Sequence, residues 1–198
     1  MASQTKPYIS PEEYLEIERR SQHKSEYFDG KMVAMSGATE NHNLISTNIS
    51  SELNVQMKGR PCKVYANDMR VKISPTGLYA YPDVVALCGQ AKFDDTQKDT
   101  LVNPAVIVEV LSDSTEAYDR GFKSEHYRRL ESLREYLLVA QDKPHVEHYV
   151  RQADNTWLFS EASGLNDEVK LSSIDCVLRL SEVYDKIEIG PRNEENAN

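Results

Sequence analysis

The chain has 198 residues, of which 39% are hydrophobic and 28% charged, a composition typical of folded globular proteins rather than disordered or membrane-spanning ones. Its 23 lysines and arginines against 32 aspartates and glutamates give a net charge of −9, which excludes a generally basic, histone-like binder of nucleic acids but not a local basic groove. Because the sequence shows no apolar signal segment and no long apolar run, we expect a cytoplasmic protein without a membrane span.

The predicted organisation is an arm over residues 1–9, one domain over 10–189 and a polar tail over 190–198. A chain of this length buries about 70% of the surface of its unfolded form, which is enough for a core without disulfides or metals. The sequence contains no Gly-rich phosphate loop and no GxSxG nucleophile motif, so the chemistry has to be sought elsewhere.

Two helices and a hairpin are predicted before residue 60. A capping-box pattern predicts a helix over 11–20, with Tyr14 and Ile17 facing inward. The Asp29-Gly30 pair supplies the positive φ angles of a tight turn and predicts a hairpin over 26–33. A second helix is predicted over 40–58, where a hydrophobic residue recurs every four positions, namely Ile45, Ile49, Leu53 and Met57.

The remaining elements are mostly strands. In chain order they are strands over 63–66, 69–73 and 83–87, a loop over 89–103, a strand over 104–111, a helix over 115–130, a strand over 135–140, a hairpin over 145–160, a strand over 169–171 and a helical turn over 181–186. The nearly continuous apolar run over 104–111 predicts a central strand buried on both faces. The succession of strand, helix and strand predicts a parallel crossover.

The three cysteines, Cys62, Cys88 and Cys176, are widely spaced and form neither a CxxC motif nor a Cys/His cluster. This pattern argues against a zinc site. We expect three free, buried thiols in a reducing compartment.

Two acids stand in strand-like segments. Glu109 lies within the apolar run, where an ionised carboxylate costs several kcal/mol unless a cation or a hydrogen-bond network compensates it. Asp83 follows Pro82 at a strand start. Carboxylates on neighbouring strands can share Mg²⁺, which leaves room for a substrate phosphate. The alternatives are a strand-cap or turn role for Asp83 and a buried ion pair for Glu109.

A possible cation follows Glu109 along the chain. On a helix, Asp119, Lys123 and Tyr127 share one face at a spacing of four residues. Such residues usually form a surface ion pair on a solvated helix. Because this helix directly follows the strand of Glu109, it can instead return toward the end of that strand and bring an ammonium to the two carboxylates.

These segments resemble one protein family. Asp83 in Tyr-Pro-Asp-Val-Val, Glu109 in Val-Ile-Val-Glu-Val-Leu-Ser and the stretch Tyr-Asp-Arg-Gly-Phe-Lys at 118–123 are similar to the Uma-type putative restriction endonuclease family of the PD-(D/E)XK nuclease superfamily. The stretches 26–30 and 132–139 match it as well, so the resemblance covers most of the chain. Each piece alone is weakly specific, and their order and spacing carry the resemblance.

The resemblance implies an α/β (α+β) restriction-endonuclease-like core, with a mixed central β-sheet flanked by helices and an N-terminal helix and β-hairpin. Asp83 takes the place of the first motif acid and Glu109 that of the second, and both are expected to bind Mg²⁺, or Mn²⁺ in its place. The superfamily lysine normally stands two residues after the second acid, where this chain has Leu111. The resemblance implies that Lys123 on the following helix substitutes for it.

Four other residues complete the predicted site. Glu26 resembles a family acid that completes the metal shell, although a surface hairpin charge is an equal alternative. His42 either reaches the same cleft or lies on a helix surface. Arg120 and Tyr127 are candidates to orient Lys123 or to contact a neighbouring phosphate.

The function implied is metal-assisted hydrolysis of DNA phosphodiester bonds by an endonuclease that acts as a homodimer. The basic residues expected to contact DNA are Lys58, Arg60, Lys63, Arg70, Lys72, Arg120, Lys123, Arg128 and Arg129. Two alternatives stay open. One is a catalytically degenerate nuclease-fold protein that acts as a nucleic-acid or protein binding module, which Leu111 and the acidic charge favour. The other is an RNA-directed nuclease or another phosphate-ester hydrolase. A glycosidase is disfavoured because it has no use for Lys123.

Overall fold

The computed structural model describes residues 8–189, so the predicted tail and residues 1–7 of the predicted arm lie outside the described part. Its elements are α1 (Pro11–Arg20), β1 (Ser25–Phe28), β2 (Lys31–Ala34), α2 (Glu40–Met57), β3 (Cys62–Ala66), β4 (Arg70–Ile73), β5 (Leu78–Ala80), β6 (Val84–Cys88), β7 (Thr100–Leu101), β8 (Val106–Leu111), α3 (Glu116–Tyr118), the π-helical turn η1 (Asp119–Lys123), α4 (Ser124–Tyr127), β9 (Glu135–Ala140), β10 (His145–Arg151), β11 (Trp157–Ser163), β12 (Glu168–Leu171), β13 (Cys176–Arg179) and α5 (Leu180–Val183). None of these helices has the length and hydropathy of a membrane span.

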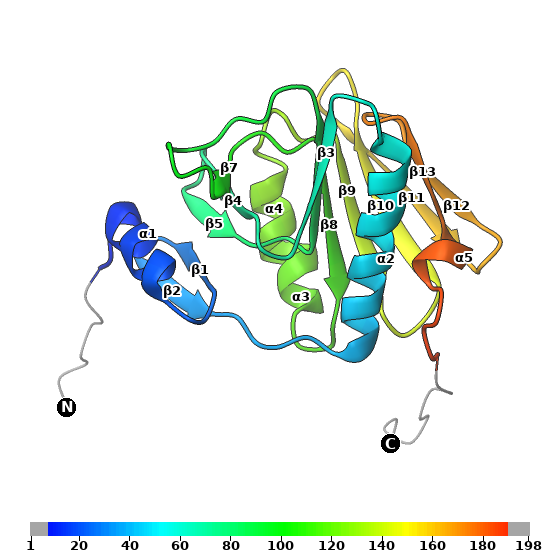
Figure 1. Ribbon diagram of the computed structural model, residues 1–198, viewed down its shortest axis with the longest axis horizontal. Coiled ribbons are helices and arrows are strands. Elements are labelled where there is room, and N and C mark those ends of the chain that lie inside the picture. Colours follow the sequence, from blue (N-terminus) through cyan, green and yellow to red (C-terminus); the bar gives the residue numbers. More distant parts are fainter. Residues whose placement is uncertain (1–7, 190–198) are drawn as a thin grey trace.

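A six-stranded mixed sheet forms the centre of the molecule, in the order β11-β10-β9-β8-β6-β3 (Figure 1). β8 and β9 run parallel, and the other neighbouring strands are antiparallel. The second sheet has the order β2-β1-β5-β4-β7, and β12 and β13 form a separate ribbon. The predicted mixed sheet flanked by helices is confirmed, as is the parallel crossover between β8 and β9.

The two faces of the central sheet carry separate cores. On one face α2 packs through the four-residue stripe of apolar side chains that the sequence showed, and all four are buried. On the other face Ile107 and Leu111 of β8 pack with Tyr127 of α4 and with the second sheet. Because side chains alternate along a strand, Glu109 shares this second face. The Glu109 side chain therefore points toward α4.

The N-terminal helix and hairpin form as predicted. The Ser10 side chain accepts the Glu13 N–H while the Glu13 carboxylate accepts the Ser10 N–H, which is the complete capping box. The hairpin turns at Asp29 and Gly30, which have φ angles of 47° and 76°. The prediction that Ile17 faces inward is wrong, because it is 46% exposed while α1 packs through neighbouring side chains.

The segment after β8 differs from the uniform helix that the sequence predicts. It consists of α3, the π-helical turn η1 and α4, and it ends at Tyr127. In η1 the Ser124 N–H bonds to the Asp119 carbonyl, five residues earlier. The predicted loop over 89–103 is also interrupted, because β7 adds two residues to the edge of the second sheet.

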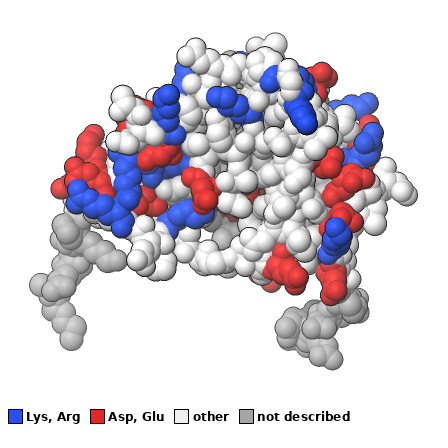
Figure 2. All heavy atoms as spheres, in the orientation of Figure 1, with Lys and Arg blue, Asp and Glu red and all other residues white. Residues whose placement is uncertain are grey.

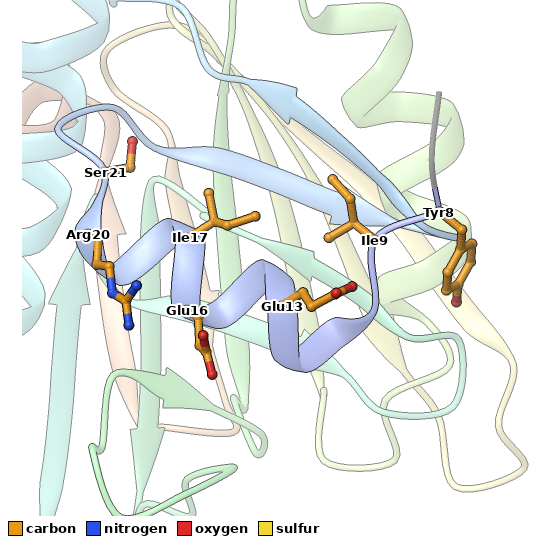
Figure 3. Close-up of a pocket in the computed structure, with 7 residues that line it drawn as sticks. All are labelled: Tyr8, Ile9, Glu13, Glu16, Ile17, Arg20 and Ser21. Carbon is orange, nitrogen blue, oxygen red and sulfur yellow. The ribbon is translucent and has the colours of Figure 1, made fainter. Parts of the chain in front are cut away.

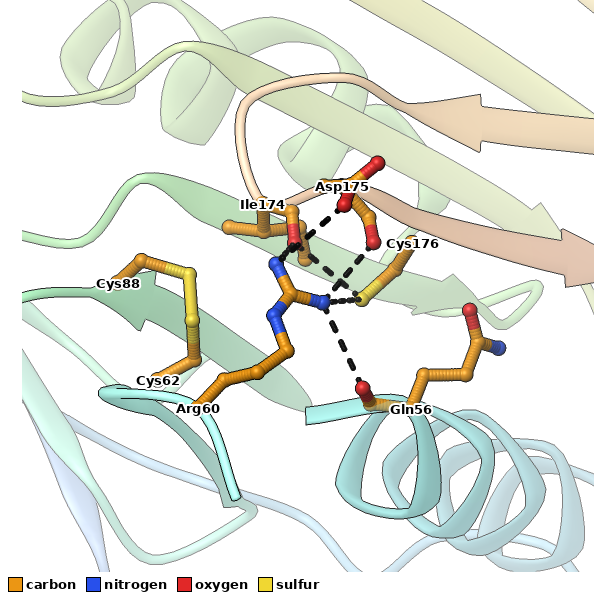
Figure 4. Close-up of a disulfide and its surroundings, with 7 residues drawn as sticks. All are labelled: Gln56, Arg60, Cys62, Cys88, Ile174, Asp175 and Cys176. Carbon is orange, nitrogen blue, oxygen red and sulfur yellow. Dashed lines mark hydrogen bonds and ion pairs between the residues drawn. A yellow bond between two sulfur atoms is a disulfide. The ribbon is translucent and has the colours of Figure 1, made fainter. Parts of the chain in front are cut away.

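The cysteine prediction is wrong for two of the three residues. Cys62 and Cys88 form a disulfide that joins β3 to β6 (Figure 4). The register of the two antiparallel strands places these residues directly opposite each other. They are 26 positions apart in sequence, so only the strand pairing reveals the bond. Cys176 is free and buried, as predicted.

Candidate active site

Asp83, directly before β6, lies opposite Glu109 of β8. The antiparallel register pairs Val84 with Val108, and one further step places Asp83 opposite Glu109. The Asp83 Oδ2 accepts the Val110 N–H at 2.7 Å, which holds this carboxylate against β8. The two predicted metal ligands thus lie together, while their metal-binding role stays a prediction.

Lys123 reaches this pair from the helix. Its Nζ lies 3.2 Å from Glu109 Oε1, 3.1 Å from Glu26 Oε1 and 3.1 Å from Asp119 Oδ1. Lys123 is 6% exposed and Asp119 is 2% exposed. The alternative of a surface ion pair on a solvated helix is therefore wrong. Leu111, at the usual position of the motif lysine, is buried in the apolar core beside Glu109.

Negative charge exceeds positive charge in this cluster. Three carboxylates, those of Glu26, Glu109 and Asp119, lie around the ammonium of Lys123, and the charge of a fourth, Asp83, acts on Glu109. Burial raises the pKa of Glu109 well above its usual value; Lys123 opposes the rise, and Asp119 and Asp83 reinforce it. Burial alone lowers the pKa of Lys123, but the Glu109, Glu26 and Asp119 carboxylates raise it well above its ordinary range. The ammonium therefore stays charged, while the raised pKa of Glu109 favours the neutral form of that carboxyl group.

The residues fit a divalent cation. Two oxygens at the site, Glu26 Oε1 and Asp119 Oδ1, are buried, and both lie 3.1 Å from the Lys123 ammonium. Carboxylate oxygens gathered at one place are ligands that a hard divalent cation accepts. The donor set is the one that Mg²⁺ and Mn²⁺ prefer. Asp83 and Glu109 are the predicted ligands, with Glu26 beside them.

A second group of possible ligands lies on the β10–β11 hairpin. One ligand atom each from His145, Glu147 and Glu161 lies within 4.8 Å of the others. Glu147 is already bonded to the Arg120 guanidinium and accepts the Tyr149 hydroxyl at 3.1 Å. This pairing neutralises the buried acid, whereas the cluster at Lys123 keeps its excess charge.

The remaining predicted residues fall into two groups. Tyr127 is fully buried and donates its hydroxyl to Glu109 Oε1 at 2.7 Å. His42, at the start of α2, places its Nε2 3.2 Å from Asp83 Oδ2, so it reaches the cleft. Burial lowers the pKa of His42, but the bond and charge of Asp83 outweigh it and raise the pKa overall. Arg120 instead contacts the Glu116 and Glu147 carboxylates.

Asp119 and Tyr136 are two residues of the cluster to which the sequence assigned no part in the site. The Tyr136 hydroxyl donates to the Asp119 backbone carbonyl at 3.1 Å, and its ring packs 5.5 Å from that of Tyr127. Asp119 was visible on the same predicted helix face as Lys123. A tyrosine hydroxyl inside the apolar 135–140 run was the available signal for Tyr136.

Most basic residues expected to contact DNA have partners within the protein. Arg60 bonds to the Ile174 and Asp175 carbonyls (Figure 4), Arg70 is buried against Tyr81 and Thr100, and Lys72 pairs with Asp94. Lys58, Lys63, Arg128 and Arg129 remain exposed. The face in Figure 2 shows mixed charges at both sides and no continuous basic stripe.

A groove of about 590 Å³ runs along α1 (Figure 3). Its lining residues are Tyr8, Ile9, Glu13, Glu16, Ile17, Arg20 and Ser21. Ile17 projects from one side of α1, and Glu16 and Arg20 from the other. None of the predicted site residues lines this groove, so it is not where we place the chemistry.

The Uma2 family model, described as "Putative restriction endonuclease", matches residues 11–181. The chain belongs to the Uma2 family. Two relatives of this Uma2 chain are the uncharacterized proteins sll1609 and slr1290 of Synechocystis sp.. The first, sll1609, is 36% identical over 172 residues, covering 87% of this chain and 97% of the relative. The other, slr1290, is 37% identical over 178 residues, covering 90% of this chain and 92% of the relative.

The Uma2 chain also shares its fold with a solved structure. A putative nuclease belonging to DUF820 from Anabaena variabilis matches with a TM-score of 0.73 and 16% identity, over 89% of this chain and 97% of that one. At this identity the match establishes the fold alone. The family match therefore confirms the resemblance drawn from the motifs, while the roles of individual site residues stay predictions.

Proposed function

We propose that this Uma2 protein is a Mg²⁺-dependent endonuclease that hydrolyses DNA phosphodiester bonds. The observation that carries the proposal is the convergence of Asp83, Glu109 and Lys123, two acids that lie opposite each other on neighbouring chain segments and one ammonium, inside a cluster rich in carboxyl groups. A bound Mg²⁺ supplies polarisation of the phosphate and a lowered pKa of its bound water. The family and the fold neighbour support a nuclease, and neither names this chain's substrate.

The chain's own residues have distinct tasks in this reaction. Asp83 and Glu109 hold the cation, and each is oriented by a donor, the Val110 N–H for the first and the Tyr127 hydroxyl for the second. Lys123 carries the positive charge that stabilises the phosphate or positions the attacking water. The position filled by the superfamily lysine is apolar here, so an ammonium delivered from η1 takes over that task.

Cleavage assays test the proposal. We expect supercoiled plasmid to be cut with Mg²⁺ or Mn²⁺ and not with EDTA, and Asp83→Ala or Glu109→Ala to lose activity by about a thousandfold or more. Lys123→Ala is expected to lose about a hundredfold, with a weaker effect on metal binding. Glu125→Ala, which removes an exposed acid of α4, is the matched control and keeps full activity. Full activity of Glu109→Ala would refute the assignment.

The same assays separate the remaining proposals. Single-stranded DNA and RNA offered beside duplex DNA decide the substrate, because the metal chemistry does not require a particular sugar. Linear rather than nicked plasmid, together with a dimer mass in light scattering, is expected for the proposed homodimer. Retained DNA binding without cleavage in any metal would support the degenerate binding module instead. The internal pairing of Arg60, Arg70 and Lys72 is the observation that favours this alternative.

A further inference from the structure

A column of aromatic rings runs along one face of the segment formed by α3, η1 and α4. The rings of Tyr118 and Phe122 stack with their centroids 5.1 Å apart and their planes 12° apart, and the Phe122 ring lies 4.2 Å from that of His126. Phe28 of the N-terminal hairpin meets Phe122 and His126 edge-on. His126 is buried, Phe122 is half-buried and Tyr118 is exposed, so the column opens to solvent at Tyr118.

The open end of this column lies beside the candidate active site. The Lys123 Nζ is 5.6 Å from the centroid of the Tyr118 ring. Burial raises the pKa of Tyr118 and the charge of Glu26 adds to the rise, so Tyr118 also adjoins an acid of the cluster. Tyr118 is nevertheless 37% exposed. An aromatic surface therefore faces solvent next to the ammonium that we expect to contact the phosphate.

The shortage of free basic side chains gives such a surface a role. Lysine and arginine bind backbone phosphates, but the net charge is −9, and Arg60, Arg70 and Lys72 have partners within the protein. Proteins that bind single-stranded DNA add aromatic rings on which bases stack, and this contact does not require a basic protein. Inside a duplex the faces of the bases are covered by their neighbours, so only an unpaired or extruded base offers a free face.

We propose that Tyr118 stacks on an unpaired base next to the phosphate that is cut, so that the preferred substrate is single-stranded or locally unpaired DNA. The inference rests on the proposed function, because it names the substrate class of the same site. The base extends the aromatic column beyond Tyr118, while Lys123 binds the adjoining phosphate. A tyrosine that only covered Phe122 would contribute to stability and would not distinguish single strands from a duplex.

Fluorescence anisotropy of a labelled single-stranded oligothymidylate in EDTA tests the inference without cleavage. We expect Tyr118→Leu, which keeps an apolar side chain but loses the flat ring, to weaken binding about tenfold, and Tyr118→Phe to bind like the wild type. Binding of a duplex of the same length should change less than about twofold, because its bases offer no free face. Phe159→Leu, the same kind of change at an exposed ring of the edge strand β11, is the matched control and should bind like the wild type. Equal affinity of Tyr118→Leu and the wild type for the single strand would overturn the inference.

A second measurement covers the case in which Tyr118→Leu does not fold, because it changes the DNA instead of the protein. An abasic strand of the same length keeps every phosphate and has no bases, so we expect the wild type to bind it about tenfold more weakly than oligothymidylate. Equal binding of the two strands would overturn the inference and leave the proposed function standing. Absence of metal-dependent cleavage of both single-stranded and plasmid DNA by the wild type would instead overturn the proposed function, whatever the binding shows.

Discussion

Glu109 shows at the scale of one residue how a carboxylate is kept in a core. It is 2% exposed and lies on a strand whose other members are all apolar. Its charge has two direct partners, the Lys123 ammonium and the Tyr127 hydroxyl, which bind the same oxygen, Oε1. The other carboxylate oxygen takes part in neither contact.

The hydroxyl of Tyr127 should contribute measurably to the free energy of unfolding. Tyr127→Phe keeps the buried ring and removes the 2.7 Å hydrogen bond to Glu109. We expect the free energy of unfolding in urea to fall by about 1 kcal/mol, because a buried hydrogen bond is lost.

Tyr65→Phe is the matched control for this substitution. Tyr65 is half-buried, and its pKa is raised by burial alone, without a charged or hydrogen-bonding neighbour among the described residues. We expect a change below about 0.5 kcal/mol. Equal losses in the two variants would mean that the bond to Glu109 contributes nothing.

At the scale of elements, α1 is attached to the segment before β7 by charge. Arg19 of α1 bonds to Asp99 at 2.7 Å and to Asp95 at 2.6 Å, across about 80 residues of sequence. The bond from Arg19 lowers the pKa of Asp99 to about 2, although partial burial opposes the shift. This pairing anchors the N-terminal unit that carries Glu26, so it supports the site from a distance.

Acid should weaken this attachment. The folded-state pKa of Asp99 is depressed below its unfolded value of 3.8, so its stabilisation is present above pH 4 and is lost as pH falls toward 2. We expect Asp99→Asn to remove that part of the acid dependence, measured as the melting temperature between pH 5 and pH 2. Because the Asp99 side chain is more than a third exposed, solvent screening limits the stabilisation that is lost in acid to about 1 kcal/mol.

Asp68→Asn provides the comparison for the acid titration. Asp68 pairs with Lys24 but is 88% exposed, so the same change there should leave the pH profile as it is in the wild type. An Asp99→Asn profile that is parallel to that of the wild type would show that the attachment of α1 does not depend on this charge.

For the whole molecule, the distribution of charge predicts how it binds DNA. The net charge is −9, and Arg60, Arg70, Lys72 and Arg120 are occupied by partners within the protein. We expect a shallow salt dependence, with a slope of log K against log salt no steeper than about −3, because few phosphates are neutralised. Fluorescence anisotropy of a labelled duplex in EDTA measures it. A slope near −6 would contradict this expectation.

The parts of the molecule that the sequence predicted are those that depend on local pattern. The helix over 40–57 follows from a stripe with a four-residue period, and the burial of β8 follows from its composition. Glu109 was recognisable because a charge in an apolar run needs a partner. The Cys62–Cys88 bond and the internal pairing of Arg70 could not be recognised from the sequence, because both depend on which strands become neighbours.

The π-helical turn has a consequence for how the site can change over evolutionary time. A π-turn is an α-helical turn lengthened by one residue, and each residue rotates an α-helix by about 100°. Loss of a single codon within 119–123 would therefore turn the Lys123 side chain away from Glu109 while leaving almost every amino acid in place. A deletion that preserves the reading frame is therefore a second route, beside substitution of an acid, by which the proposed site would be dismantled.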